Sequence, residues 1–540
     1  MRANLVEYGN PGHSAHEICR LRLLLHREGI FVLYAKVAGS TIVGIEGVNI
    51  SVEVDVSGGL PGLEITGMGD TAVRESRHRV RSAVRNSGFD VPPRRITVNL
   101  APAAIHKEGS QLDLPIALGI LQASGFIPEG ERHKEYCFLG ELALDGSLRP
   151  VRGALAMVLS AREDGYHGAV LPRANGAEVA FIRDMDLRTA DSLSEVTEFT
   201  RGRTELALPK SEGEGRRASA GVPDLCDIKG QAAAKRALEV AAGGGHNLLM
   251  IGSPGAGKSM LARAIPGILP DLTPEEAIEV TRISSVAATL PQGSGLLKER
   301  PFRAPHHTVT VTALIGGGAN PVPGEVTLAH RGVLFLDELP EFPPSVLNAL
   351  RQPLEDGRAV VTRSRATSVF PCRFVLVGAM NPCPCGYFSD PLQECTCREH
   401  VRRQYVSRVS GPFLDRIDLH LEVPRVTSGE LMAGPGESSA AVKERITEAW
   451  KLQRERLKGT GLMCNAEMGP KEVSVLISVS GQARKLLMNA FSIMRLSART
   501  YYRVLKVAAS IADLAGSPRV EEEHVAEALS YRPNVVGSNA

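Results

Sequence analysis

The spacing of apolar and polar positions divides the chain into a part with mixed strands and helices and a part rich in helices. Apolar and polar residues alternate in short runs such as residues 34–37, 50–56 and 94–100, which is typical of half-buried strands. Strand and helix patterns then alternate and predict an α+β or α/β domain over residues 32–199. Further on, apolar positions follow the helical period in residues 439–458, 480–494, 498–514 and 521–530. We therefore expect a small helical domain over residues 428–540.

Two segments do not fit these patterns. Residues 1–31 mix histidines, arginines and a Pro-Gly pair without a clear period. We interpret them as a weakly structured extension that arises from an upstream choice of start codon, the alternative being an amphipathic helix over residues 19–27. Residues 200–222 are rich in glycine, serine and charge, which is typical of a flexible linker.

A glycine-rich loop lies between an apolar run, residues 247–251, and a helical pattern, residues 260–265. The loop fits the pattern G-x-x-x-x-G-K-[ST] at every fixed position, with Gly252, Ser253, Pro254, Gly255, Ala256, Gly257, Lys258 and Ser259. A strand–loop–helix of this kind directs backbone N–H groups and a helix N-terminus at one spot, which favours a polyphosphate. We expect Lys258 to contact the β- and γ-phosphates of ATP and Ser259 to bind Mg²⁺. The loop indicates a nucleotide-binding domain over residues 223–427.

Two later apolar strands in this domain end in polar side chains. Residues 331–336 lead into Asp337 and Glu338, and residues 373–380 lead into Asn381. We expect Asp337 to help hold Mg²⁺ and Glu338 to act as the general base on the attacking water. The amide of Asn381 can hold that water or contact the γ-phosphate. The alternative for the first strand is a buried strand capped by solvated acids.

Composition and charge restrict the class of protein further. A chain of 540 residues favours about three domains, and 43% apolar with 23% charged residues describes an ordinary soluble globular protein. No apolar run reaches membrane-spanning length and no signal peptide is evident, so we expect a cytoplasmic protein. The net charge of +2 neither requires nor excludes a nucleic-acid partner. Nine cysteines without an export signal argue against a disulfide framework.

Four of these cysteines are clustered as C-x-C…C-x-C, at Cys383, Cys385, Cys395 and Cys397. Four thiolates suit a tetrahedral, structural Zn²⁺ with no open position for water, and such an ion would fix the loop that follows Asn381. The one-residue gaps differ from the usual two-residue spacing, so four idle thiols are the alternative.

The strand-end pattern resembles the AAA+ ATPases, in which the position of Asn381 is called sensor 1. Residues 227–231 resemble the segment beside the adenine in this superfamily, which places Ile228 near the base. Residues 410–420 resemble the arginine-finger segment of the helicase and chelatase branch. The resemblance implies that Arg416 is offered to ATP on the neighbouring subunit.

Residues 496–503 resemble the sensor 2 helix, with Arg499 as the first candidate and Arg503 as the second. For Arg416 and Arg499 alike, the alternative is a solvated arginine on a helix. If both roles hold, each catalytic site is shared between subunits, and a ring, expected to be a hexamer, is required.

With residues 246–250, 303–307 and 381–386, these motifs make the chain similar to the magnesium-chelatase-like AAA+ family called YifB or ComM, over about residues 34–532. The resemblance implies a P-loop AAA+ core, a C-terminal helical lid, and ATP with Mg²⁺. ComM is understood as a hexameric DNA helicase that drives branch migration in natural transformation. The resemblance therefore implies a DNA motor; the alternative is a chelatase-type ATPase that remodels a protein partner.

Two segments of the nucleotide-binding domain suit DNA contact. Residues 358–369 predict a hairpin with Arg363 and Arg365 at its tip, and in related ring helicases the hairpin at this place projects into the pore. Six copies would offer guanidinium groups to a phosphate backbone, which gives sequence-independent, salt-sensitive binding. An exposed hairpin with solvating arginines is the alternative. Residues 302–324 are consistent with a mobile pore loop, whose His306 and His307 we interpret as structural.

The N-terminal domain resembles the Lon protease domain around residues 137–151, which implies a Lon-protease-like (S5-like) α/β fold. Lon-type proteolysis needs a serine nucleophile and a lysine. Those positions fall on Gln111 and Leu155, so proteolysis stays a minor alternative that would need Ser110. The same fold binds DNA in a branch-migration ATPase of the RadA type. A basic helix suits that role or simple solvation, through Arg74, Arg77, Arg79, Arg81 and Arg85.

Overall fold

The computed structural model describes residues 33–210 and 221–532, apart from residues 68, 70, 108, 129, 292, 319–320, 363–366, 389, 433, 435 and 495–496. The expected extension, residues 1–31, lies outside the described residues, as do residues 211–220 of the expected linker. Within the described part, no helix is both long and apolar enough to cross a membrane.

A seven-stranded mixed sheet forms the N-terminal domain. Its order is β3-β4-β2-β1-β5-β8-β9. The strands are β1 (Leu33–Val43), β2 (Glu46–Ser57), β3 (Gly62–Thr66), β4 (Arg95–Ala101), β5 (Tyr136–Phe138), β8 (Gly168–Pro172) and β9 (Asp186–Ala190). β1 and β2 form an antiparallel hairpin, whose turn uses Gly44 in the left-handed region (φ 67°). The alternating burial along β2 follows the alternation of its sequence, as expected for a strand that faces a core on one side.

Helices cover both faces of this sheet. Phe138 and Val170 belong to the core that holds α2 (Thr71–Asn86) and α3 (Asp113–Ala123), whereas the neighbouring Cys137 and Ala169 belong to the core that holds α5 (Ala154–Glu163). Since successive strand residues point to opposite faces, α2 and α3 cover one face and α5 covers the other. The remaining elements of this domain are α4 (Glu131–Glu135), β6 (Glu141–Leu142), β7 (Leu148–Arg149), α6 (Gly176–Val179) and α7 (Leu193–Thr200).

The second domain is built on a five-stranded parallel sheet of order β11-β14-β17-β10-β18. Its strands are β10 (Leu248–Ile251), β11 (Phe302–Arg303), β14 (Val333–Leu336), β17 (Val375–Met380) and β18 (Leu419–Glu422). β14 and β17 are buried along their whole length, which explains their unbroken apolar sequences. The carboxyl ends of parallel strands share one edge, so the segments that follow β10, β14 and β17 meet there.

Helices and short elements surround this sheet. The helices are α8 (Ala232–Gly244), α9 (Lys258–Ile268), α10 (Pro274–Val286), α11 (Val311–Ile315), α12 (Glu325–Leu328), α13 (Pro344–Ala349), α14 (Arg351–Asp356), α15 (Glu399–Ser407), α16 (Gly411–Leu414) and α17 (Ser428–Met432). Two small hairpins pair β12 (Gly316–Gly317) with β13 (Val322–Pro323) and β15 (Arg358–Thr362) with β16 (Thr367–Pro371).

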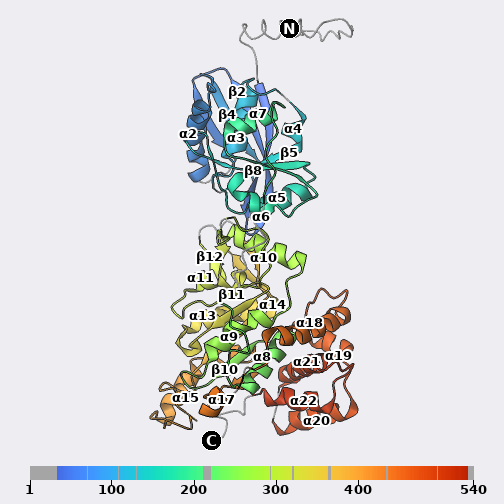
Figure 1. Cartoon of the computed structure of the whole chain (residues 1–540). Coiled ribbons are helices and arrows are strands. Elements are labelled where there is room, and N and C mark those ends of the chain that lie inside the picture. Colours follow the sequence, from blue (N-terminus) through green and yellow to red (C-terminus); the bar gives the residue numbers. More distant parts are fainter. Residues whose placement is uncertain are drawn as a thin grey trace.

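The described residues of the C-terminal part form the helices α18 (Ser439–Arg456), α19 (Pro470–Leu476), α20 (Gly481–Ile493), α21 (Ala498–Leu514) and α22 (Glu522–Ser530). They lie beside the five-stranded sheet in Figure 1 and share its core through α8. Trp450 donates to the carbonyl of Ala242 over 2.9 Å, and Gln453 donates to the carbonyl of Gly243 over 2.7 Å. These bonds satisfy the carboxyl end of α8, which would otherwise be buried without partners.

The N-terminal domain rests on α10 of the second domain (Figure 1). The N–H of Gly153, just before α5, donates to the carbonyl of Ser285 over 3.2 Å. The Ser285 hydroxyl in turn donates to the buried carboxylate of Glu178 over 2.5 Å. Arg282 forms an ion pair of 2.6 Å with Glu46. The two domains are therefore joined by buried polar contacts as well as by packing.

Candidate nucleotide site

The glycine-rich loop after β10 has an open backbone. Gly255 (φ 78°) and Gly257 (φ 90°) are left-handed, and a Cβ at either position would meet nothing within 4 Å. Gly252 is different, because a Cβ there would lie 2.2 Å from the carbonyl oxygen of Val423. The loop is thus packed at its start on Val423, which follows β18, and faces free space at its tip. This is the shape that lets backbone N–H groups approach a phosphate chain.

Lys258 begins α9 and folds its side chain over this loop. Its Nζ donates to the carbonyls of Gly252 (2.7 Å) and Ser253 (3.0 Å) and to Oδ1 of Asn381 (3.1 Å). Burial lowers the pKa of Lys258, and the charge of Asp337 opposes that shift. The predicted lysine and the predicted sensor 1 amide therefore touch, although 123 positions separate them in the chain.

The two predicted Mg²⁺ ligands also meet. The hydroxyl of Ser259 donates to Oδ2 of Asp337 over 2.7 Å, and Oδ1 of Asp337 accepts from the N–H of Glu338 over 2.9 Å. A hydroxyl and a carboxylate at the end of a phosphate-binding loop are the oxygen ligands that Mg²⁺ takes alongside phosphate. These residues fit ATP with Mg²⁺.

Glu338 stands at the edge of this site. Its backbone is left-handed (φ 52°), and its side chain is 59% exposed, so the carboxylate can reach solvent. Oε2 of Glu338 lies 3.4 Å from Nδ1 of His307. The ring of His307 packs on that of His306, with 4.0 Å between centroids. The sequence did not predict a role for His307 at this site. His307 follows β11, which pairs in parallel with β14, so it lies at the same end of the sheet as the polar groups that follow the other strands.

The segment expected beside the adenine is tied to the same loop. Ile228 is buried in the core, and Gln231, with a left-handed backbone (φ 56°), donates to the carbonyls of Ala256 (3.2 Å) and Pro424 (2.6 Å). Ile228 is therefore held close to the glycine-rich loop through Gln231.

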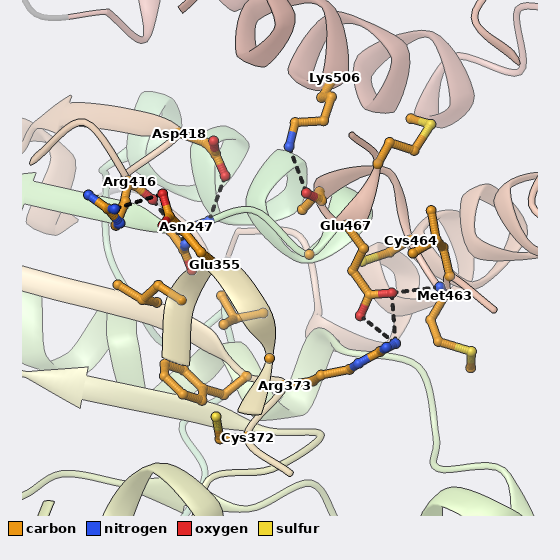
Figure 2. A pocket seen from close by; sticks show the side chains of 18 of the residues that line it. Asn247, Glu355, Cys372, Arg373, Arg416, Asp418, Met463, Cys464, Glu467 and Lys506 are labelled. Carbon is orange, nitrogen blue, oxygen red and sulfur yellow. Dashed lines mark hydrogen bonds and ion pairs between the residues drawn. The ribbon is translucent and has the colours of Figure 1, made fainter. Parts of the chain in front are cut away.

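Arg416 and Arg499 lie at the end of the sheet opposite to the glycine-rich loop. Asn247, which precedes β10, donates through its side chain to the carbonyl of Arg416 over 3.1 Å. Lys258 instead follows the carboxyl end of β10. Arg416 forms an ion pair of 2.7 Å with the carboxylate of Glu355 (Figure 2), and Arg499 pairs with the same carboxylate. The structure thus brings the two predicted arginines together and separates them from the nucleotide loop of their own chain.

These arginines line a cavity of about 620 Å³ between the five-stranded sheet and the C-terminal helices (Figure 2). Burial by itself raises the pKa of Glu355, but the hydrogen bond and charge of Arg416 and the charge of Arg499 outweigh it, and the pKa is lowered. Arg503, the second sensor 2 candidate, points instead at Asp418, 3.7 Å away, and burial lowers its pKa. The cavity is cationic, with Glu355, Asp418 and Glu467 among its acids.

Comparison with known proteins assigns the family. The model "Magnesium chelatase, subunit ChlI" matches residues 224–431, "Subunit ChlI of Mg-chelatase" matches residues 52–175, and the corresponding C-terminal model matches residues 436–532. YifB of Escherichia coli (strain K12) is 44% identical over 91% of this chain and 95% of its own length. The competence protein ComM of Haemophilus influenzae is 42% identical over 91% of this chain and 96% of its own length.

The chain belongs to the YifB/ComM family of magnesium-chelatase-like proteins. The 38 kDa subunit of the magnesium chelatase of Rhodobacter capsulatus is a more distant relative, 30% identical over 25% of this chain and 43% of its own length. The family supports an AAA+ ATPase that uses ATP and Mg²⁺, in agreement with the loop geometry. These matches confirm the family that the sequence motifs predicted.

In this YifB/ComM protein, the four clustered cysteines converge as the spacing predicted. The Sγ atoms of Cys383, Cys385, Cys395 and Cys397 all lie within 4.8 Å of one another. The Sγ of Cys383 is 3.3 Å from that of Cys385 and 3.7 Å from that of Cys395, and Cys385 and Cys395 are 3.6 Å apart. Four sulfurs around one Zn²⁺ at 2.3 Å are separated by about 3.8 Å, so the thiol set fits a tetrahedral soft metal.

In the described part of the N-terminal domain, the residues considered for a peptidase centre make other contacts. Gln111 donates to Thr41 over 2.9 Å, and Leu155 is fully buried. Ser110 donates to the carboxylate of Glu141, and the buried Lys107 donates to the carbonyl of Pro102. Among the described residues, no hydrogen bond joins a serine to a lysine in this domain.

The structure describes some, but not all, of the residues predicted to contact DNA. Arg363 and Arg365 lie outside the described residues, and the described strands on either side of them pair up to Thr362 and Thr367. On α2, Arg79 forms an ion pair of 2.8 Å with the buried Asp113 and so contributes to the fold. The other α2 arginines have exposed side chains, at Arg74, Arg77, Arg81 and Arg85.

Proposed function

We propose that this protein is an ATP-hydrolysing motor that assembles as a ring, a homo-hexamer, and acts on DNA as a ComM-like branch-migration helicase. The observation that carries the ring is the placement of Arg416 and Arg499 on the far edge of the sheet. β17 has six residues, so the two edges of the sheet are about 20 Å apart. Arg416 is too far from Lys258 to serve its own site, which supports the proposal that a neighbouring subunit is its target.

ATP bound with Mg²⁺ supplies the phosphoryl group and the cation that neutralises its charge. Lys258 exchanges the carbonyls of Gly252 and Ser253 for phosphate oxygens, and a charged partner is the stronger one for a buried ammonium. Ser259 and Asp337 offer the two metal ligands that already touch. Glu338 accepts the proton of the attacking water at its exposed carboxylate, and Asn381 orients that water.

DNA as the partner is supported by the resemblance to ComM and by basic groups in suitable places. Arg363 and Arg365 would line the pore at the tip of the hairpin formed by β15 and β16. The exposed arginines of α2 would give the N-terminal domain a second basic surface. Contacts of this kind read phosphates rather than bases, so binding is expected to weaken as salt increases.

We also propose that the N-terminal domain has the Lon-protease-like fold without its peptidase chemistry, and that the four cysteines hold one structural Zn²⁺. Gln111 and Leu155 cannot act as nucleophile and base, which supports the first proposal. The convergence of four sulfurs supports the second.

The test is ATP turnover measured with and without DNA, and strand displacement on forked and three-stranded DNA. Lys258→Ala is the control, because it removes the phosphate-contacting cation. We expect turnover to rise with DNA and both activities to disappear in Lys258→Ala. A rate of ATP turnover that does not change when DNA is added would contradict the DNA motor. It would favour the chelatase-type alternative, an ATPase that remodels a protein partner. Casein cleavage lost in Ser110→Ala would contradict the proposal that the domain is not a peptidase.

A further inference from the structure

We propose that the metal held by Cys383, Cys385, Cys395 and Cys397 shapes the nucleotide site, so that metal loading and ATP binding reinforce each other. This inference rests on the ATP site and on the metal proposed above. It goes beyond a local structural role, because the loop that carries the thiols is packed directly on the glycine-rich loop.

The first link runs through Asn381. This residue accepts from Lys258 over 3.1 Å and lies two positions before Cys383. The backbone of Asn381 lies beside the hydroxyl of Tyr405, a buried residue of α15. Asn381 is thus held between the end of β17 and the helix that follows the cysteine loop, and any shift of Cys383 is passed to it.

The second link is the contact between Gly386 and Pro254. Gly386 follows Cys385 in a left-handed conformation (φ 86°), and a Cβ there would lie 2.5 Å from Cδ of Pro254. No larger residue fits between the cysteine loop and the nucleotide loop. The position of Cys385 therefore fixes how closely the cysteine loop supports Pro254.

The third link is Asp390, which lies between the two cysteine pairs. Its carboxylate lies beside the side chain of Ser253, which lowers the pKa of Asp390, and it lies 2.8 Å from Nε of Arg425. Ser253 belongs to the nucleotide loop, and its carbonyl accepts from Lys258. Asp390 thereby ties the stretch between the cysteine pairs to the part of the loop that faces the phosphates.

Besides the three links above, the cysteine loop is held by the buried Cys383 and by cation–π contacts of Arg402 with Phe388 and of Arg425 with Tyr387. Between the end of β17 and the start of α15 at Glu399, the described residues form no helix or strand. The described residues of this stretch contribute nothing to the hydrophobic core clusters, and residues 391–394 are exposed. A loop of this length without a core is ordered by a cross-link, and four thiolates on one metal supply it. Because coupling between two sites is reciprocal, a metal that orders this loop favours ATP binding, and ATP slows loss of the metal.

The experiment uses the full chain. Metal content is measured by elemental analysis, affinity for a non-hydrolysable ATP analogue by titration, and the rate of zinc release to a chelator with and without that analogue. Two variants are compared with the wild type: the double variant Cys395→Ser with Cys397→Ser, and Asp390→Asn. Cys226→Ser is the matched control, since Cys226 is a free cysteine outside the cluster.

We expect one zinc per chain in the wild type and in Cys226→Ser, and release that the analogue slows at least fivefold. The double variant should lose the metal and bind the analogue at least tenfold more weakly. Asp390→Asn should keep the metal but lose the effect of the analogue on its release. This last variant keeps all four thiols, so it tests the coupling even if the double variant fails to fold.

The outcomes separate the proposals. A wild-type chain without metal would overturn the metal site and with it the inference. If the chain binds the analogue but the analogue does not change the rate of metal release, the coupling alone would be overturned. Metal in a chain that binds no analogue would overturn the proposed nucleotide site, on which the coupling depends.

Discussion

The guanidinium of Arg416 lies 2.7 Å from the carboxylate of Glu355, on the edge of the sheet that faces away from the chain's own nucleotide loop. Arg499, from a helix 83 positions later, pairs with the same carboxylate. Glu355 therefore gathers two arginines that the sequence had related only by resemblance. Arg416 also donates to the carbonyl of Arg351 over 3.2 Å, so contacts within its own chain hold this side chain in place.

If Arg416 completes the site of a neighbouring subunit, two inactive variants should rescue each other. Arg416→Ala alone should lose about 10³-fold in turnover, the usual contribution of an arginine supplied in trans. Lys258→Ala alone should be inactive as well. Mixed subunits should recover part of the turnover, because some interfaces pair an intact loop with an intact Arg416. Full hydrolysis by an unassembled Arg416→Ala monomer would contradict the shared site.

Replacing Glu355 with glutamine should destabilise the fold, because the largely buried Arg416 loses its charged partner. Since Glu355 is 38% exposed, we expect a loss of about 1–2 kcal/mol, below that of a fully buried pair. In the folded state the pKa of Glu355 is lowered below 4.5. The ion pairs of Glu355 therefore stabilise the fold fully above pH 4.5, and this stabilisation is lost as the pH falls through the folded-state pKa. Thermal unfolding of Glu355→Gln and wild type should therefore differ at pH 7 and converge in acid. Glu399→Gln, which breaks an exposed pair with Arg403, is the control and should change little.

His307 should position Glu338 for catalysis. The Glu338 carboxylate is exposed and has an unusual left-handed backbone, so a neighbour 3.4 Å away restricts where it points. We expect His307→Ala to lower kcat about tenfold without changing nucleotide affinity, and His307→Asn, which can still donate, to recover part of it. Steady-state ATPase assays and analogue titrations measure the two quantities. Equal loss in His306→Ala and His307→Ala would show that loop packing, not the contact with Glu338, is responsible.

Glu178 should make the contact between the first two domains sensitive to pH. Burial raises the pKa of this carboxyl above 4.5, although Ser285 and Asn175 donate to it. The charged form is thus disfavoured in the folded state, and wild-type stability should increase as the pH falls toward the raised value. Glu178→Gln removes that charge, so its Tm should exceed that of wild type by a few degrees near pH 8, and the gap should close in mild acid. Glu163→Gln, an exposed change on α5, should show no such gap.

Several elements could be predicted from sequence because their signal is local. The helix over residues 498–514 is α21, and the apolar runs before Lys258, Glu338 and Asn381 are the buried strands β10, β14 and β17. The cluster of cysteines was visible because its two pairs are close in the chain. By contrast, His307 carried no signal of its own, because two adjacent histidines in a loop acquire meaning only when β11 pairs with β14.

The sequence by itself determined the chemistry: a phosphate-binding loop, two acids and an amide at strand ends, and four thiols. These follow from residue type and short spacing, which the chain states directly. The tertiary structure alone decided which of them meet. Parallel strands bring Lys258, Asp337 and Asn381 to one end of the sheet and Arg416, which precedes β18, to the other, where the packing of α21 adds Arg499. The reason is that strand direction and strand order are set by long-range packing, which no local run of residues records.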